Sequence, residues 1–531
     1  MKMSRLSAAL AAALALSATP LAPQAQVRLP ALGESVSEDF SVGAEKRLGE
    51  QIMREVRRDP DYLDDPQLLD YLQTIWQPLV QAARARGEIT AETESLFAWE
   101  SFLVRDRSIN AFALPGGYVG VHLGLMAATT SRDELAAVLA HELSHVSQRH
   151  IARSMVNASR QSLVGMAAII LGAIAASRAS SADATQAVVV GGQAALQQGQ
   201  LNFSRDMERE ADRVGYGVLS SAGFSPAGVA TMFEKLESAY RLNDSGAYPY
   251  LRSHPLTGER IGDARSRASL GQAAPQSSPL RHVMMQARAR VLADAREPSL
   301  RRAQGADAVA PSATPAERLG AFYASALAST QLRDWARADA ALQKAEALLR
   351  ASPQAEASAL RALQWLRAQS LAARGEGLRA LAVLDEADDD GSRSALLLRA
   401  QAATVAAQRS GPPGQDQAPA ALRQSVEALQ TWVSLHRHDA TAWSQLAQSA
   451  GQAGLPLRAV RAEAEARAAV GDFNGAIDRL RAAQRLARNP TRGDFIDASI
   501  IDARLRDLET ARRELAAELR ADRRGSQGPD Q

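Results

Sequence analysis

The sequence predicts a mainly α protein with two folded parts, an α+β domain that contains a small β-sheet and an all-α solenoid that follows it. Three observations predict this fold class. Apolar residues recur at helical spacing along most of the 531 residues. The stretch 101–125 differs, because aromatic and β-branched residues surround a Pro-Gly-Gly turn. Residues 314–520 are rich in Ala, Leu and Arg, with Gly and Pro breaks between the helical segments.

The first residues predict a secretory signal peptide. Lys2 and Arg5 precede the apolar run 6–16, and small residues and prolines follow it up to Ala25. The apolar run is too short to span a bilayer. We therefore expect cleavage after Ala25 or Ala18 and export of the mature protein. Residues 1–25 are assigned to the signal peptide and 26–275 to the α+β domain.

Composition excludes several classes of function. The formal net charge is only +2, which gives no electrostatic reason to expect nucleic acid or an anionic surface as the main partner. The chain has no cysteine, so it has neither disulfides nor thiolate metal ligands. Any zinc ion would have to be bound by histidine and carboxylate side chains.

The elements of the first domain follow from local patterns. Apolar spacing predicts helices between Glu38 and Ala85, and Phe102–Val104 predicts a short strand. Residues 111–124 predict a strand, a turn and a second strand. A helix should begin near Ser131, because this residue is a favourable N-cap and Glu134 follows three residues later.

The segment His141-Glu142-Leu143-Ser144-His145 is the most informative motif of the chain. Two histidines at i and i+4 on a helix lie about 40° apart around its axis, so both imidazoles can bind one zinc ion. Glu142 lies beside them, where its carboxylate can deprotonate a zinc-bound water. The alternative is a helix with buried, hydrogen-bonded histidines. On a continuous helix His150 would lie about 140° from His145, which makes it a surface or supporting residue and not a ligand.

A catalytic zinc site needs a further protein ligand, and the segment 207–212 is the best candidate. Glu208 and Asp212 share one face of a predicted helix, so Glu208 can bind zinc while Asp212 orients a zinc-binding histidine. Glu210 would point about 160° away from Asp212 and is expected to be solvated. The alternative is an ordinary charged helix face, because arginines alternate with these acids.

Four segments resemble, in their order along the chain, the HtpX/CAAX-prenyl-protease class of zinc metallopeptidases, and above all its exported branch with a repeat tail. They are Asn110–Gly117, His141–His150, Ser204–Asp212, and Ser253–Leu256 with Arg260. The resemblance covers roughly residues 35–275 and implies a zincin-type metallopeptidase domain with one zinc ion per chain. It also implies that Glu208 is the third ligand and that Asp212 supports the site. The sequence shows no membrane spans of the kind found in HtpX and the prenyl proteases, so prenyl-protein processing is not expected.

His254 is a candidate active-site residue on two grounds. It follows a helical segment and precedes Pro255, so its side chain can swing. As a neutral imidazole it could become a fourth zinc ligand, and turned away as an imidazolium it could steady an oxyanion. The resemblance implies an active-site role for His254 and Arg260, and a latch role for His254. The alternative is a surface loop histidine.

One apolar run needs a separate interpretation. Residues 163–176 contain no charge, but they are too few to span a bilayer. We expect either a buried helix or a mobile helix that covers the cleft or contacts a membrane peripherally. The Ser-, Ala-, Gly- and Gln-rich segment 177–200 beside it suits a flexible lid.

The second half predicts repeated helix pairs. Trp443–Ala447 fits the opening of a tetratricopeptide unit, and Phe322–Pro353 fits another pair with its closing proline. We expect about three to five such units in residues 314–520, after a connecting helix and linker at 276–313 and before a disordered tail at 521–531. Stacked pairs form a concave surface suited to a protein partner. The alternative is a generic helical bundle.

Together these patterns predict an exported zinc-dependent endopeptidase with a repeat domain that binds clients or partners. The resemblance implies a periplasmic location, misassembled outer-membrane proteins as clients and the outer-membrane barrel assembly machinery as partner. One alternative is a periplasmic assembly chaperone with latched or minor protease activity. Another is hydrolysis of a non-protein envelope polymer such as peptidoglycan. A free strand edge near residues 111–119 would favour polypeptide substrates, because an extended peptide can add to it as a further strand.

Overall fold

The computed structural model describes residues 40–156, 171, 205–242, 249–270, 280–353, 356–387, 390–409, 418–487 and 495–526. The signal peptide predicted at 1–25 and the lid segment predicted at 177–200 lie outside the described residues, as does the apolar run 163–176 except for Leu171.

A small mixed sheet lies in the first domain, as predicted. Its strands are β1 (Tyr62–Leu63), β2 (Glu100–Val104), β3 (Ala111–Leu114) and β4 (Tyr118–His122), in the spatial order β1-β2-β4-β3. β2 and β4 run parallel, and the other two pairings are antiparallel. Gly116 and Gly117 form the turn between β3 and β4 with φ angles of 77° and 93°, which other residues rarely adopt. Because β3 is last in the spatial order, it is an edge strand.

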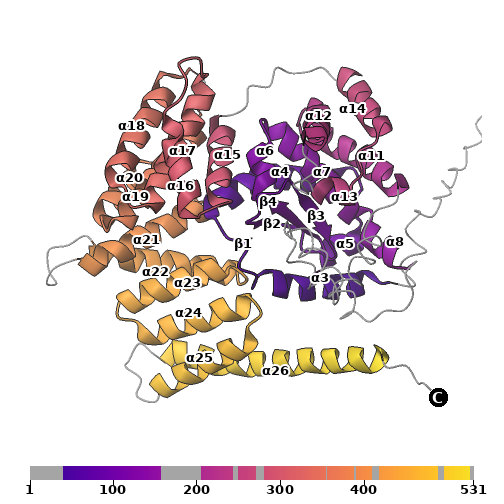
Figure 1. Ribbon diagram of the computed structural model, residues 1–531. Helices are drawn as coiled ribbons and strands as arrows, with labels where there is room; N and C mark the ends of the chain where they lie inside the picture. The colour runs from indigo at the N-terminus through magenta and orange to yellow at the C-terminus, as the bar shows by residue number, and fades with distance from the viewer. Residues whose placement is uncertain are drawn as a thin grey trace, which may run out of the picture.

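Ten helices surround this sheet among the described residues 40–270 (Figure 1). They are α3 (Val42–Val56), α4 (Pro66–Ala85), α5 (Ala91–Leu96), α6 (Leu123–Ala128), α7 (Arg132–Ser147), α8 (His150–Val156), α11 (Arg205–Ser221), α12 (Ala227–Leu242), α13 (Pro249–Ser253) and α14 (Gly258–Leu270).

Helix α7 is the central helix of this domain. Every residue from Glu134 to Ser147 is buried, because the sheet, α4, α11 and α12 pack around it. Small and apolar residues allow a helix to be buried on all sides. The Ser131 side chain accepts a hydrogen bond from the Glu134 backbone N–H, so the predicted N-cap is confirmed.

The second half is entirely helical over its described residues. α15 (Leu280–Leu292) and α16 (Glu297–Gln304) precede α17 (Pro315–Gln331), α18 (Trp335–Ala351), α19 (Ala357–Ala373), α20 (Gly377–Glu386), α21 (Arg393–Arg409), α22 (Ala418–Leu435), α23 (Ala440–Gln452), α24 (Pro456–Ala469), α25 (Phe473–Leu486) and α26 (Phe495–Ser526). Consecutive helices pack against each other in an array that curves around the first domain (Figure 1). The mainly α fold class is confirmed, and the tetratricopeptide assignment stays a prediction. Helix α26 continues beyond residue 520, where the sequence suggested a disordered tail.

One hydrophobic cluster crosses the boundary between the two halves. A continuous cluster of buried residues extends from Val42 in α3 to Leu366 in α19. Helix α15 lies inside this cluster and packs on α4, α6, α17 and α19. Residues 276–313 are therefore more than the connecting helix and linker that the sequence suggested. No helix among the described residues is long and apolar enough to cross a membrane.

Candidate metal centre

Helix α7 directs both motif histidines to one point. His141 Nε2 and His145 Nε2 lie 3.0 Å apart, and both side chains are buried. Glu208 approaches from α11, with Oε2 3.5 Å from His141 Nε2 and Oε1 3.5 Å from His145 Nε2. The three side chains that the sequence proposed as zinc ligands are thus brought together from two helices.

His254 completes the cluster. It follows the short helix α13, and its side chain is buried and not on the surface. His254 Nδ1 lies 2.9 Å from Glu208 Oε1 and 3.4 Å from His141 Nε2. One ligand atom from each of the four residues lies within 4.8 Å of the others. Imidazole nitrogens and a carboxylate are the donors that zinc takes in a cysteine-free protein, so the residues present fit this ion.

Glu142 lies beside the cluster with its carboxylate fully buried. Neither oxygen has a side-chain hydrogen-bond partner among the described residues, and His254 Nε2 is 3.5 Å from Oε1. Burial raises the pKa of Glu142, although the nearby His254 and His141 oppose this effect. A buried carboxylate with unused acceptor sites and a raised pKa is a suitable general base.

Asp212 and Arg260 support the cluster from behind. Asp212 Oδ1 lies 3.0 Å from His141 Nδ1, and Asp212 in turn accepts hydrogen bonds from Arg260 Nε at 2.6 Å and Nη2 at 2.9 Å. Arg260 Nη1 also lies 2.8 Å from Glu208 Oε2. Burial raises the pKa of Asp212, but its hydrogen bonds to His141 and Arg260 outweigh that effect and lower the pKa to about 2. Asp212 therefore stays ionised and can accept a hydrogen bond from His141 Nδ1.

Two side chains lie near the cluster through contacts that helical spacing alone did not predict, and His150 takes the supporting and not the surface position. His150 does not continue helix α7, because α7 ends at Ser147 and Arg149 has a φ of 52°. The His150 side chain is buried, with Nδ1 2.9 Å from His145 Nδ1. Glu210 was expected to be solvated, but its Oε2 lies 3.0 Å from His150 Nε2. The prediction for Glu210 was wrong because helical geometry gives its direction but not the element that it faces.

Tyr250 is a further residue at the site that the sequence did not indicate. Its buried ring lies 4.7 Å from the His254 ring and 6.5 Å from the His141 ring, measured between centroids. The only sequence signal is its position four residues before His254, which places both on successive turns. The Tyr250 backbone carbonyl accepts a hydrogen bond from the His254 backbone N–H at 2.8 Å, which fixes the start of the loop.

The fold and the cluster together define a metallopeptidase domain. Residues 68–268 match the model described as Peptidase family M48, so this part of the chain is a peptidase family M48 domain. The family resemblance drawn from the motifs is thereby confirmed.

Individual relatives are similar to somewhat less than half of the chain. The chain is similar to the Beta-barrel assembly-enhancing protease of Escherichia coli (strain K12), with 36% identity over 244 residues, or 45% of this chain and 47% of the relative. The protein of the same name from Yersinia pestis is 36% identical over 254 residues, or 48% of this chain and 50% of the relative. Mitochondrial metalloendopeptidase OMA1 of Schizosaccharomyces pombe is 31% identical over 223 residues, or 42% of this chain and 60% of the relative. The chain spans about half the length of the two bacterial relatives.

Proposed function

We propose that this protein is a zinc-dependent endopeptidase. The observation that carries the proposal is the buried group of four ligand atoms within 4.8 Å of one another, with the Glu142 carboxylate beside it. His141, His145 and Glu208 would hold the zinc ion. When bound, zinc supplies a water of lowered pKa and polarises the scissile carbonyl.

Glu142 acts as the general base in this proposal. Its carboxylate takes a proton from the attacking water and passes it to the leaving amine. Burial favours this role, because the raised pKa of Glu142 makes its ionised form a stronger base than an exposed carboxylate. Asp212 holds the His141 proton on Nδ1, so that Nε2 keeps its lone pair for the metal.

The edge of β3 is the proposed substrate-binding element. The His122 backbone N–H donates to the Asn110 carbonyl at 3.0 Å, which sets the alternation of the β3–β4 ladder. By this alternation Ala111 and Ala113 direct their backbone groups away from β4, toward the edge that no other described strand occupies. The Ala113 backbone is also among the groups that lower the pKa of Glu142, so this edge faces the general base. An extended polypeptide bound here would lie alongside the catalytic carboxylate.

His254 is proposed to regulate access to the site. Its Nδ1 lies among the ligand atoms, where a neutral imidazole would occupy the position that the attacking water needs. Rotation of this side chain would open that position. The location of His254 directly after a five-residue helix, on a loop, is compatible with such a movement. Arg260 binds the Pro255 carbonyl at 2.9 Å and so ties this loop to Glu208.

The clients and location are proposed from the relatives. Their name, Beta-barrel assembly-enhancing protease, supports a role in quality control of misassembled outer-membrane proteins, in contact with the barrel assembly machinery. This role requires a periplasmic location, which agrees with the signal pattern at residues 1–25. The helical array after residue 314 would bind a client or partner on its concave face, as tetratricopeptide solenoids do.

Casein cleavage by the purified mature protein tests the enzymatic proposal, with bound zinc quantified in each variant. We expect wild-type cleavage, none in Glu142→Gln, and increased cleavage in His254→Ala. Glu134→Gln is the matched control, because Glu134 is also buried on α7 but pairs with Lys235 away from the cluster. Wild-type activity in Glu142→Gln would refute the assignment of the base.

The chaperone function remains the second candidate, and the position of His254 within the ligand cluster is the observation that favours it. A protein latched in this way would bind zinc and clients without cleaving them. If zinc is stoichiometric but neither wild type nor His254→Ala cleaves casein, the chaperone function is favoured over the peptidase.

A further inference from the structure

We propose that His150 is a positioning residue that supports the proposed zinc ligand His145 through a chain of hydrogen bonds ending at Glu210 and Arg153. This inference rests on the proposed zinc site, and it adds a second supporting arm to the one formed by Asp212 and Arg260. Each arm begins at Nδ1 of a proposed zinc-binding histidine, which is the ring nitrogen that faces away from the metal position.

The positions of the protons follow from the distances. His145 Nε2 faces the ligand cluster, so a neutral His145 carries its proton on Nδ1. That proton points to His150 Nδ1 at 2.9 Å, which must therefore accept. His150 then carries its own proton on Nε2 and donates it to Glu210 Oε2 at 3.0 Å. Arg153 Nη1 donates to the same oxygen at 2.7 Å and keeps Glu210 ionised. Each donor in the chain thus has an acceptor, and the tautomer of His145 that can bind zinc is selected.

Both arms fix the tautomer of a proposed ligand histidine, but they differ in length. His141 donates directly to Asp212, which pairs with Arg260, whereas His145 reaches Glu210 only through the ring of His150. The rings of His145 and His150 stand at 77° with centroids 4.8 Å apart, so His150 also packs against the ligand.

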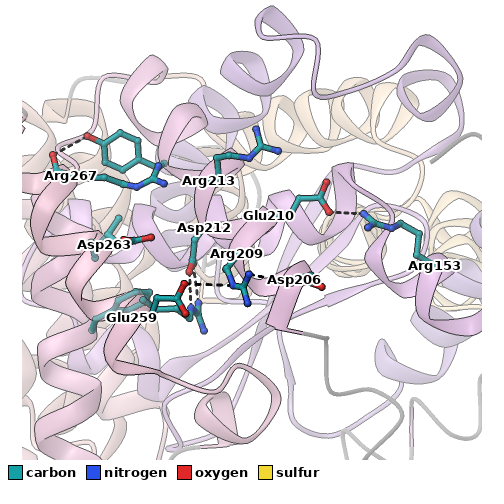
Figure 2. A pocket seen from close by; sticks show the side chains of 14 residues that line it. Arg153, Asp206, Arg209, Glu210, Asp212, Arg213, Glu259, Asp263 and Arg267 are labelled. Carbon is teal, nitrogen blue, oxygen red and sulfur yellow. Dashed lines mark hydrogen bonds and ion pairs between the residues drawn. The ribbon is translucent and has the colours of Figure 1, made fainter. Parts of the chain in front are cut away.

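Both terminal carboxylates belong to helix α11 and line the same pocket of about 470 Å³. Figure 2 shows Glu210 joined to Arg153 on one side of this pocket, with Asp212 further along the same helix. The helix that supplies the proposed ligand Glu208 therefore also supplies the anchor of each arm. A displacement of α11 would change all three together.

A backbone feature places His150 in this chain. Arg149, with a φ of 52°, interrupts the helix between α7 and α8 and turns the chain so that His150 folds back onto His145. The Arg149 guanidinium binds Glu45 Oε2 at 2.8 Å and the Phe40 carbonyl at 2.7 Å, which holds this conformation against α3. If residue 149 had the right-handed helical conformation instead, α7 would continue and residue 150 would point elsewhere.

Zinc affinity, measured by competition with a chromogenic chelator, tests the inference in the full chain. His150→Phe keeps the buried ring but has no acceptor for the His145 proton, and we expect affinity to fall roughly 10–100-fold. His150→Asn offers its side-chain oxygen near the position of Nδ1, so it should recover part of this loss. The cobalt(II)-substituted protein should show a changed d–d absorption band in His150→Phe but not in the control.

His282→Phe is the matched control. His282 is likewise a buried histidine with both ring nitrogens hydrogen-bonded, to Tyr71 and to the Thr129 carbonyl, but neither partner belongs to the cluster. Its zinc affinity should equal that of wild type even if its melting temperature falls. Wild-type affinity in His150→Phe, an equal loss in His282→Phe, or no recovery in His150→Asn would each overturn the inference. If zinc is bound but neither wild type nor His254→Ala cleaves casein, the proposed peptidase is refuted while this comparison of zinc affinities stays intact.

Discussion

The buried ion pair between Arg288 and Asp65 should couple the stability of the metallopeptidase domain to that of the helical array. Two parallel hydrogen bonds of 2.7 Å join the guanidinium on α15 to the carboxylate that caps α4. Arg288 also reaches Tyr323 on α17 and Gln369 on α19, at 3.4 Å and 3.2 Å. Its side chain is only 3% exposed, so solvent screens the pair weakly.

Replacing Arg288 by Met removes the cation and leaves Asp65 buried without its partner. Loss of one member of a buried pair costs about 3–5 kcal/mol. For a cooperative unit of about 300 residues, with an unfolding entropy of about 2.1 cal/mol/K per residue, this corresponds to a fall in melting temperature of about 5–8 °C. We expect a value inside this range because Asp65 keeps its hydrogen bond from the Leu68 backbone N–H, which stabilises the remaining charge.

Scanning calorimetry of the full chain measures this effect. The hydrophobic cluster is continuous from Val42 to Leu366, so the metallopeptidase domain and helices α15–α19 should unfold in one transition that shifts as a whole. The Asp65→Asn/Arg288→Met double variant removes both charges but keeps an N-cap, and should recover about half of the loss or more. A shift below about 2 °C in Arg288→Met, or losses that simply add in the double variant, would refute the argument.

Three other outcomes follow from the structure. Asp212→Ala removes the carboxylate behind His141 and should weaken zinc binding roughly 10–100-fold in the same chelator competition, and unchanged affinity would contradict the role of this arm. Burial lowers the pKa of His282 from 6.5 to about 4, so the unfolded chain takes up a proton first as the pH falls. Wild type should therefore lose about 3 kcal/mol relative to His282→Phe between about pH 6.5 and 4 in urea unfolding, and a constant difference would exclude this effect. In Gly49→Ala the new methyl group would overlap the Pro115 carbonyl, which should cost about 1–3 kcal/mol in thermal unfolding, whereas Gly262→Ala, with open space around it, should not destabilise.

Local features of the site could be predicted from the sequence. The i, i+4 spacing of His141 and His145 fixes their common direction on any regular helix, and the same holds for Glu208 and Asp212. The strand-turn-strand pattern before α7 was equally readable, because Gly116 and Gly117 permit the turn and alternate residues suit a sheet. Each of these predictions depends on only a few neighbouring residues.

Long-range and single-residue effects could not be predicted. The direction of His150 depends on one backbone angle at Arg149, a residue type that normally continues a helix, and on its ion pair with Glu45 in α3. The pair between Asp65 and Arg288 joins residues more than two hundred positions apart, and neither has a local pattern that indicates burial. Charged side chains are expected on the surface unless a partner is known.

Helix α11 carries three acids at alternate positions, and each has its own contact at this site. Glu208 and Asp212 lie about 40° apart on one face, where they meet the histidines of α7 and Arg260. Glu210 points to the far side, about 160° from Asp212, and can contribute only because α8 crosses there after the turn at Arg149. The proposed site therefore contacts two faces of α11. Each carboxylate also has an arginine partner, Arg260 or Arg153, which reduces the repulsion that unpaired carboxylates on one helix would create.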